Sequence, residues 1–168
     1  MSTQADQSST KMDADTEQYL TFFLADEEYG VDILKVQEIR GWDGATAIPN
    51  TPDYILGVSN LRGMVVPIID LRQRFQLANV EFNSSTVVVI VKVVSDSNER
   101  TVGLVVDAVS EVYSLPKEAI GEAPDLGGAI STSFVKGLAT MDEKMIILLD
   151  IDLLINTGVL NDMELAQT

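Results

Sequence analysis

Short hydrophobic runs, most of them rich in β-branched or aromatic residues, alternate with polar turn sequences along most of the chain. Such residues fit the pleated surface of a sheet and lose rotamer freedom in a helix. The pattern predicts an all-β protein, mainly β with short helices, built as small barrels or a sandwich. The runs expected to form strands are Tyr19–Leu24, Tyr29–Val36, Ile55–Val58, Met64–Leu71, Thr86–Val94, Thr101–Val109 and Lys144–Leu149.

Short helices are expected where a capping residue or a proline follows a strand. The three segments are Asp70–Phe75, Pro116–Ile120 and Asp150–Ile155. An aspartate at the start of a helix accepts a hydrogen bond from an amide that has no partner inside the helix, and proline there loses no bond. We therefore expect Asp70 and Asp150 to be helix caps.

The two ends of the chain differ from its middle. Residues 1–16 are rich in Ser, Thr, Gln and Asp and are expected to form a disordered tail. Residues 161–168 are expected to be a frayed end. Between them, residues 17–160 are predicted to form a single domain of two β subdomains.

A faint internal repeat supports the expectation of two subdomains. Gly30–Ile39 matches Gly103–Val112 in a pattern of glycine, branched apolar residues and glutamate, at an offset of 73 positions. Tyr54–Leu71 resembles Phe134–Ile151 at an offset of 80. Two matches in the same order at similar offsets predict two related β units, although β-rich chains also produce such matches by coincidence.

A tight polar turn, Asn60–Gly63, lies between two of the hydrophobic runs and carries Arg62. An arginine at a turn tip can offer a fork of donors to a partner, or it can be ordinary surface charge. It can also form an ion pair with Glu38, the only charged residue of the Val36–Ile39 segment. Pairing and partner contact are compatible, and the sequence leaves both open.

Composition limits the chemistry that this chain can perform. Among 168 residues there is no histidine and no cysteine, so the usual general base and the commonest transition-metal ligands are missing. A net charge of −15 disfavours nucleic acid and anionic membranes. The apolar runs are too short for a membrane helix and no signal peptide is recognisable, so we expect a soluble cytoplasmic protein.

Carboxylates are the remaining candidates for catalysis, and a pair of them could serve as general acid and base in a hydrolase. The chain has no phosphate-binding glycine loop, nucleophile elbow or metal-ligand cluster. We therefore predict no enzyme, no cofactor and no metal, and keep a carboxylate-pair hydrolase as an alternative. The carboxylates considered are Asp32, Glu38, Asp70, Asp107, Glu111, Asp150 and Asp152.

Four apolar residues occupy equivalent places in the two repeats: Val36 and Ile39 in the first, Val109 and Val112 in the second. Each pair has a spacing of three at the end of a predicted strand. If the two subdomains pack side by side, these residues could line a groove that accepts the apolar face of a helix. Ordinary core packing is the alternative.

The segment from Glu28 to Phe75, which contains the sequence NLRGMVVPIIDLR, resembles the CheW family of chemotaxis coupling proteins. VGLVVDAVSEV and FVKGLATMDEKMIILLDIDLLI resemble later parts of that domain. The resemblance covers roughly Glu17–Ile155, and its Asn60–Arg72 core is quite specific. Ser59 departs from it, since the family usually has an apolar residue before the asparagine.

The resemblance implies two small five-stranded β-barrels around a shared apolar core. It also implies an adaptor that joins chemoreceptor cytoplasmic tips to the regulatory domain of the histidine kinase CheA, in receptor arrays at the inner membrane. A scaffold for a non-chemotactic two-component pathway is the alternative. The kinase-docking residues stay unassigned, and the positions where the family contacts receptor or supports that contact are Val36, Glu38, Ile39, Gly57, Arg62, Val109 and Val112.

Overall fold

The computed structural model describes residues 16–77, 80–95, 98–122, 134–141 and 143–156. The expected tail and the expected frayed end therefore lie outside the described residues, with one exception. Thr16, which we placed in the tail, is the first residue of strand β1.

Strands dominate the described chain, and they are β1 Thr16–Leu24, β2 Glu27–Asp32, β3 Val36–Gly41, β4 Ile55–Leu61, β5 Met64–Asp70, β6 Val87–Ser95, β7 Asn98–Val106, β8 Ala108–Pro116, β9 Ile120–Gly121, β10 Val135–Met141 and β11 Lys144–Leu149. The helical elements are one turn long, namely the 3₁₀ turns η1 Ile33–Lys35 and η2 Lys117–Ala119 and the α-helices α2 Leu71–Arg74 and α3 Ile151–Leu154.

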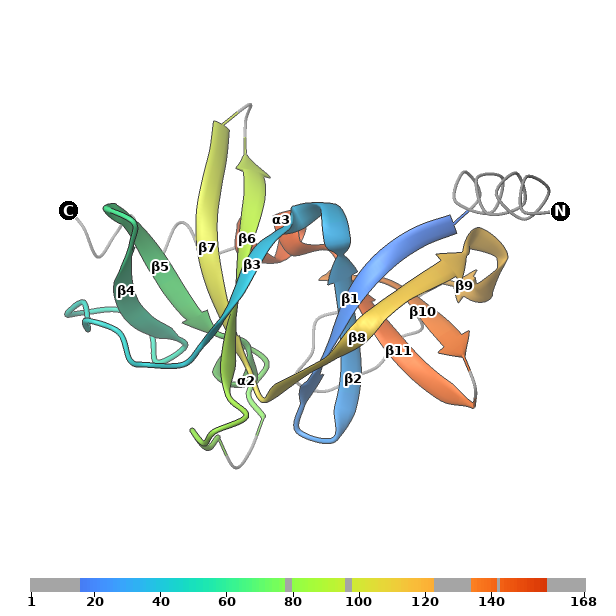
Figure 1. Cartoon of the computed structure of the whole chain (residues 1–168), viewed down its shortest axis with the longest axis horizontal. Coiled ribbons are helices and arrows are strands. Elements are labelled where there is room, and N and C mark those ends of the chain that lie inside the picture. The colour runs from blue at the N-terminus through green and yellow to red at the C-terminus, as the bar shows by residue number, and fades with distance from the viewer. Residues whose placement is uncertain (1–15, 78–79, 96–97, 123–133, 142, 157–168) are drawn as a thin grey trace, which may run out of the picture.

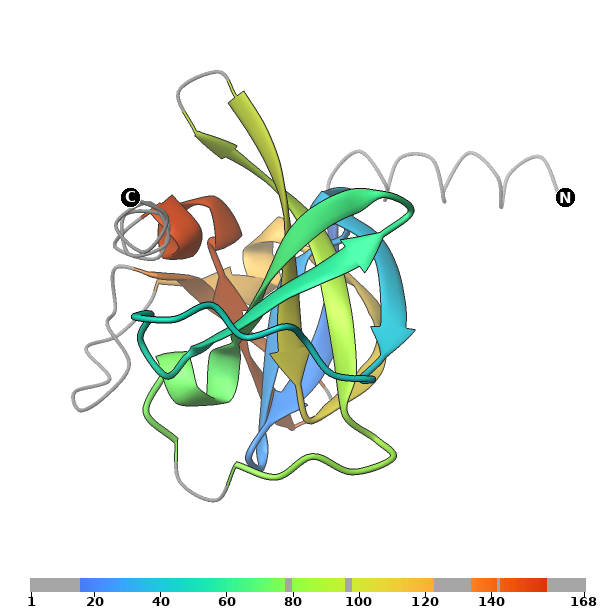
Figure 2. The ribbon, with the colours of Figure 1, turned by 90° about the vertical axis from the view of Figure 1, so that its left-hand side faces the viewer.

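The strands form two curled sheets that lie side by side (Figure 1). One has five strands in the order β3-β6-β7-β5-β4, and the other has six in the order β8-β1-β2-β11-β10-β9. The quarter-turned view shows the five-stranded sheet in front and the hairpin of β6 and β7 projecting from it (Figure 2). The predicted mainly-β fold with short helices is confirmed, and one sheet has a sixth strand, the two-residue β9.

The internal repeat is confirmed as a structural repeat, and its halves are exchanged between the sheets. Gly30 of the first repeat pairs in parallel with Leu148 of the second, and Gly103 of the second pairs in parallel with Ile68 of the first. Equivalent register shifts precede Gly57 and Gly137. Each sheet therefore combines strands from both halves of the chain.

The largest cluster of buried side chains lies between the two sheets and includes Phe22, Tyr29 and Leu104. Side chains on a strand alternate between its two faces, so Leu20 and Phe22 of β1 join this shared core. Tyr19 instead joins a smaller cluster on the other face of the same sheet. The five-stranded sheet has a similar small cluster of its own. The fold is thus held together mainly by apolar contact across the junction of the sheets.

Two predicted strands are each interrupted by an aspartate. The expected strand Tyr29–Val36 ends at Asp32, whose carboxylate accepts a hydrogen bond from the Leu34 amide and starts η1. The expected strand Thr101–Val109 breaks at Asp107, between β7 and β8. Each run was predicted to be one continuous strand, and this was wrong. The periodicity of apolar residues does not show where the chain crosses from one sheet to the other.

Both predicted aspartate caps are confirmed. Asp70 accepts a hydrogen bond from the Arg72 amide at the start of α2. Asp150 accepts one from the Leu153 amide at the start of α3. The third predicted helix, at Pro116–Ile120, is the 3₁₀ turn η2.

Candidate functional site

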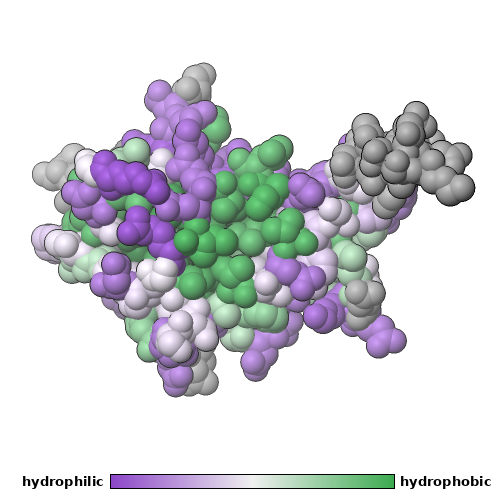
Figure 3. Space-filling model, in the orientation of Figure 1, coloured by the Kyte–Doolittle hydropathy of each residue, from purple (hydrophilic) through white to green (hydrophobic). Residues whose placement is uncertain are grey.

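A hydrophobic surface occupies the middle of the face drawn in Figure 3, where β3 and η1 approach β8 in the same view of Figure 1. Leu34 is 87% exposed, Val112 49% and Ile39 43%. Val36 and Val109 are half-buried and pack against the shared core. We call these five residues the inter-sheet surface, and they leave an accessible apolar strip above the junction of the sheets.

The spacing of three in each pair is explained by β-bulges. The pairing of β3 with β6 shifts register between Val36 and Glu38. The pairing of β1 with β8 shifts opposite Val109 and Val112. A bulge inserts one extra residue, so residues three apart come to the same face of the strand. The two bulges thus place both apolar pairs toward the junction of the sheets.

Arg62 and Glu38 form the ion pair that the sequence had left open. Arg62 Nη1 donates to Glu38 Oε1 at 2.8 Å, and Nη2 donates to Oε2 at 3.2 Å. The Arg62 side chain remains 75% exposed, while that of Glu38 is 25% exposed. The pair therefore ties the β4–β5 turn to β3 and still leaves the guanidinium accessible to a partner.

The turn that carries Arg62 is a two-residue hairpin loop. Arg62 has φ 53° and Gly63 has φ 84°, and positive φ at both residues is typical of a type I′ turn. The Asn60 side chain accepts a hydrogen bond from the Gly63 amide at 2.8 Å. The turn therefore presents Arg62 in one orientation, as the tight polar tip predicted.

Gly57, one of the predicted site residues, lies in a buried position. Its φ is 137°, and a Cβ built there would lie 1.9 Å from the carbonyl oxygen of Thr46. Next to it, Thr46 and Val58 exchange two backbone hydrogen bonds of 2.8 Å. Only glycine permits this close approach between the β3–β4 connection and β4.

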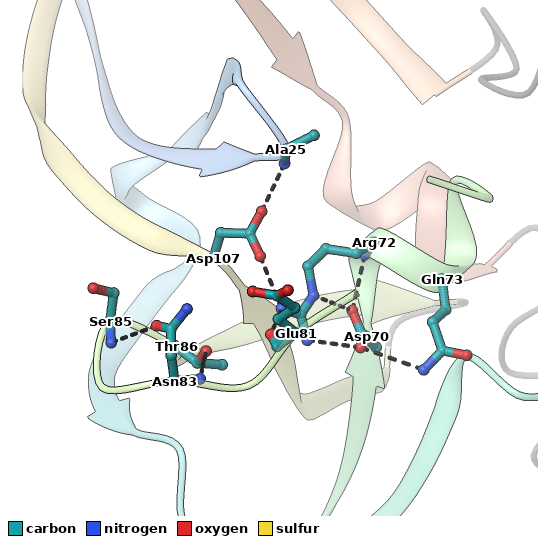
Figure 4. A network of polar contacts seen from close by, with 9 residues as sticks. All are labelled: Ala25, Asp70, Arg72, Gln73, Glu81, Asn83, Ser85, Thr86 and Asp107. Carbon is teal, nitrogen blue, oxygen red and sulfur yellow. Dashed lines mark hydrogen bonds and ion pairs between the residues drawn. The ribbon is translucent and has the colours of Figure 1, made fainter. Parts of the chain in front are cut away.

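A buried arginine, Arg72, holds the junction of the sheets at the start of β8 (Figure 4). Its side chain is 2% exposed and lies 2.9 Å from Asp70 and 2.8 Å from Asp107. Asp107 also accepts a hydrogen bond from the Ala25 amide at 2.6 Å, which reaches the β1–β2 turn. Burial disfavours the charged form, yet hydrogen bonds to both aspartates outweigh it and raise the pKa of Arg72.

A second ion pair holds the equivalent junction at the start of β3. Lys35 Nζ lies 2.6 Å from Asp152 Oδ2, and Asp152 Oδ1 accepts the amide hydrogen of Val94 at 2.9 Å. Asp152 occupies the position in α3 that Arg72 occupies in α2. The helix residue is therefore acidic in one pair and basic in the other, and its partner carries the opposite charge. Neither pair was predicted from the sequence. The signal for them was that Arg72 and Asp152, which carry opposite charges, occupy matching positions of the repeat.

The carboxylates considered for hydrolysis are mostly engaged in structural contacts. Asp70 and Asp150 cap helices, while Asp107 and Asp152 form ion pairs. Within the part of the chain that the structure describes, no group of three or more acidic side chains is placed to hold a metal ion. None of the described helices is long and apolar enough to cross a membrane. At least four of the seven carboxylates considered thus have structural partners.

Known proteins resemble this chain in sequence and in fold. The family model described as CheW-like domain matches residues 18–158. The chain is 48% identical over 141 residues to the chemotaxis protein CheW of Klebsiella aerogenes, covering 84% of this chain and 82% of that protein. It is 38% identical over 135 residues to the probable chemotaxis protein CheW of Rhizobium etli, covering 80% and 84%.

A solved structure, the scaffolding protein TtCheW of Thermoanaerobacter tengcongensis, matches with a TM-score of 0.76 and 36% identity, covering 85% of this chain and 94% of that one. Together, the two-sheet fold and these matches define a β-rich protein of the scaffold class. The chain belongs to the CheW-like domain family and is an adaptor of the chemotaxis type.

Proposed function

We propose that this chain couples chemoreceptor cytoplasmic tips to the histidine kinase CheA through protein–protein contacts alone, without catalysis. It would act in the cytoplasm, within receptor arrays at the inner membrane. The observation that carries the proposal is the inter-sheet surface, whose exposed Ile39 and Val112 lie at positions where the family resemblance places receptor contact.

The physical fit is with a helical partner. A receptor tip is a helical hairpin, and one apolar side of it can cover an apolar strip that would otherwise face water. The Arg62–Glu38 pair supplies a polar rim to such a contact. Several weak contacts of this kind, repeated in an array, give avidity without a tight single interface.

The kinase partner is proposed from the family, whose kinases carry a regulatory domain of the same fold. No residues of this chain are assigned to that contact. Signalling would require that receptor or kinase bind two arrangements of the complex with different free energies, because a ligand shifts an equilibrium only by its differential affinity.

The test introduces a charge into the inter-sheet surface. Ile39→Asp and Val112→Asp change exposed residues, so the fold should persist, while Val36→Asp and Val109→Asp probe the half-buried pair. We expect each to weaken binding to receptor tips by at least about tenfold, because a carboxylate would lose water on docking. Circular dichroism checks the fold, and Val65→Asp, at an exposed β5 residue, is the matched control.

Normal binding by Ile39→Asp and Val112→Asp would remove the inter-sheet surface from the proposal. Co-purification of the unaltered protein from a native lysate tests the partners. Recovery of a histidine kinase without chemoreceptors would favour a non-chemotactic two-component scaffold instead.

A further inference from the structure

The segment η1, residues Ile33–Lys35, joins β2 of one sheet to β3 of the other and presents Leu34 on the inter-sheet surface. None of its three residues is buried. It is flanked by two clefts, of about 340 and 230 Å³, the first beside Ile33 and Leu34 and the second beside Lys35 and Asp152. Ile33 packs against the edge of the shared core, whereas Leu34 is exposed, so packing holds one side chain of η1 and leaves Leu34 to solvent.

Polar contacts hold η1 in addition to the packing of Ile33. Two are local: the Leu34 amide donates to Asp32 at 2.9 Å, and the Val36 amide donates to the Ile33 carbonyl. The Lys35–Asp152 pair is a contact that reaches outside the β2–β3 connection. Since Asp152 also accepts the Val94 amide, this pair ties η1 to both α3 and the end of β6.

The opposite side of the inter-sheet surface is anchored more firmly. There β8 begins after Asp107, whose partner Arg72 is 2% exposed and makes several hydrogen bonds. The side chains of Lys35 and Asp152 are each 30% exposed and share one short contact. A partly solvated pair is screened by salt and holds its side chains less firmly than a buried, multiply bonded one.

We propose that the Lys35–Asp152 ion pair positions the η1–β3 side of the inter-sheet surface against the fixed β8 side, and thereby sets the shape offered to a helical partner. The inference rests on the proposed function. It makes Lys35 and Asp152 positioning residues: they act through Leu34 and Val36 rather than by touching the partner. It also predicts that high salt loosens one side of the surface only.

The first experiment measures the position of the two sides without any partner. The chain has no cysteine, so Gln37→Cys on β3 and Glu111→Cys on β8, both exposed, accept a pair of spin labels directly. Double electron–electron resonance of the labelled full chain should give one narrow distance distribution. Lys35→Met should broaden or shift it, and so should Asp152→Asn, which keeps an oxygen for the Val94 amide.

Two further variants make the result specific. If the two residues act as one pair, the double variant should broaden the distribution no more than either single change. The matched control is Lys92→Met, which removes a surface ion pair to Glu99, 3.5 Å long, on the projecting hairpin. It should leave the distribution unchanged.

The second experiment measures affinity for receptor tips. Lys35→Met and Asp152→Asn should each weaken binding about 2- to 5-fold, the effect of losing one partly exposed ion pair. An unchanged distance distribution would overturn the inference, and so would a changed distribution with unchanged affinity. Normal binding by Ile39→Asp would instead overturn the docking surface itself, so the two failures are distinguishable.

Discussion

At the scale of single residues, Arg62 has two compatible roles that mutation can separate. It bonds Glu38 through two nitrogens, yet most of its side chain faces solvent. An exposed pair of this kind contributes at most about 1 kcal/mol, so losing it should not unfold the protein. If Arg62 also contacts a partner, its removal should reduce function by more than this small loss of stability can explain.

We expect Arg62→Ala to lower CheA activation in a reconstituted receptor array, and Glu38→Gln to lower it less. Glutamine keeps an acceptor oxygen for the arginine but removes the charge of the carboxylate. The measurement is the rate of ATP-dependent kinase phosphorylation. Equal effects of the two changes would mean that Arg62 acts only through Glu38, and no effect of Arg62→Ala would exclude it from the site.

Gly57 gives a prediction about stability. Gly57→Ala would force a Cβ to within 1.9 Å of the Thr46 carbonyl oxygen at a φ of 137°, so neighbouring backbone must move. We expect a loss of at least about 2 kcal/mol in the free energy of unfolding, measured by urea titration. Gly41→Ala is the control, because nothing lies within 4 Å of its Cβ position. Equal stability of the two variants would contradict the assigned role of Gly57.

Local rules predicted some residues of the site and missed others. The caps at Asp70 and Asp150 depend only on the next few residues, so the sequence was sufficient. Contacts such as Lys35–Asp152 join positions more than a hundred residues apart. No spacing rule identifies such a partner before the sheet order is known.

At the scale of elements, hydrophobic pattern predicted where strands occur better than where they end. The expected run Lys144–Leu149 coincides with β11. The expected run Tyr29–Val36 was wrong because it crosses from one sheet to the other through η1, while its apolar residues continue along both strands and the turn between them. In the sequence, the apolar residues of the inter-sheet surface cannot be distinguished from the continuation of a strand.

Strands β1 and β2 each bury a tyrosine, which links their stability to alkaline pH. Burial, assisted by a hydrogen bond to Glu17, raises the pKa of Tyr19 to about 12. Burial also raises the pKa of Tyr29 to about 12. The ordinary value is about 10, so between about pH 10 and 12 the unfolded chain loses these protons while the folded chain keeps them.

Stability from these two groups is therefore fully present below about pH 10 and is lost as the pH rises toward about 12. We expect the urea midpoint to fall across this range, and Tyr19→Phe to make the fall shallower. Ultraviolet absorbance of tyrosinate, followed in the folded protein, should show part of the titration delayed to about pH 12. If every tyrosine ionises near pH 10 while the protein stays folded, the burial argument fails.

At the scale of the whole molecule, the repeat explains why the two sheets form one body. Under the repeat, β3-β6-β7-β5-β4 and β8-β1-β2-β11-β10 are the same strand order with the two halves exchanged. The crossings fall at η1 and at Asp107, which are also the two anchored junctions. The sequence predicted two related units but not this exchange, since a pattern match does not show which copy a strand pairs with.

The exchange leads to a prediction about folding. Residues 1–77 contain β2 without its partner β11, and β5 without its partner β7. Residues 80–168 contain β11 and β7 without β2 and β5, and the pairings of β1 with β8 and of β3 with β6 also join the two halves. Each half alone therefore exposes unpaired strand edges and the apolar face of the shared core. We expect neither half to fold alone, and an equimolar mixture to recover β structure because each half supplies the missing strands of the other.

Circular dichroism and amide nuclear magnetic resonance of the separate and mixed halves would measure this. The matched control is a mixture in which the second half carries Gly103→Val, since the added side chain would meet those of Ile68 and Val88, both within 2.8 Å of the Cβ position. That mixture should recover less structure. A well-dispersed spectrum from residues 1–77 alone would show that the strands of the first half pair among themselves, and would contradict the exchanged arrangement.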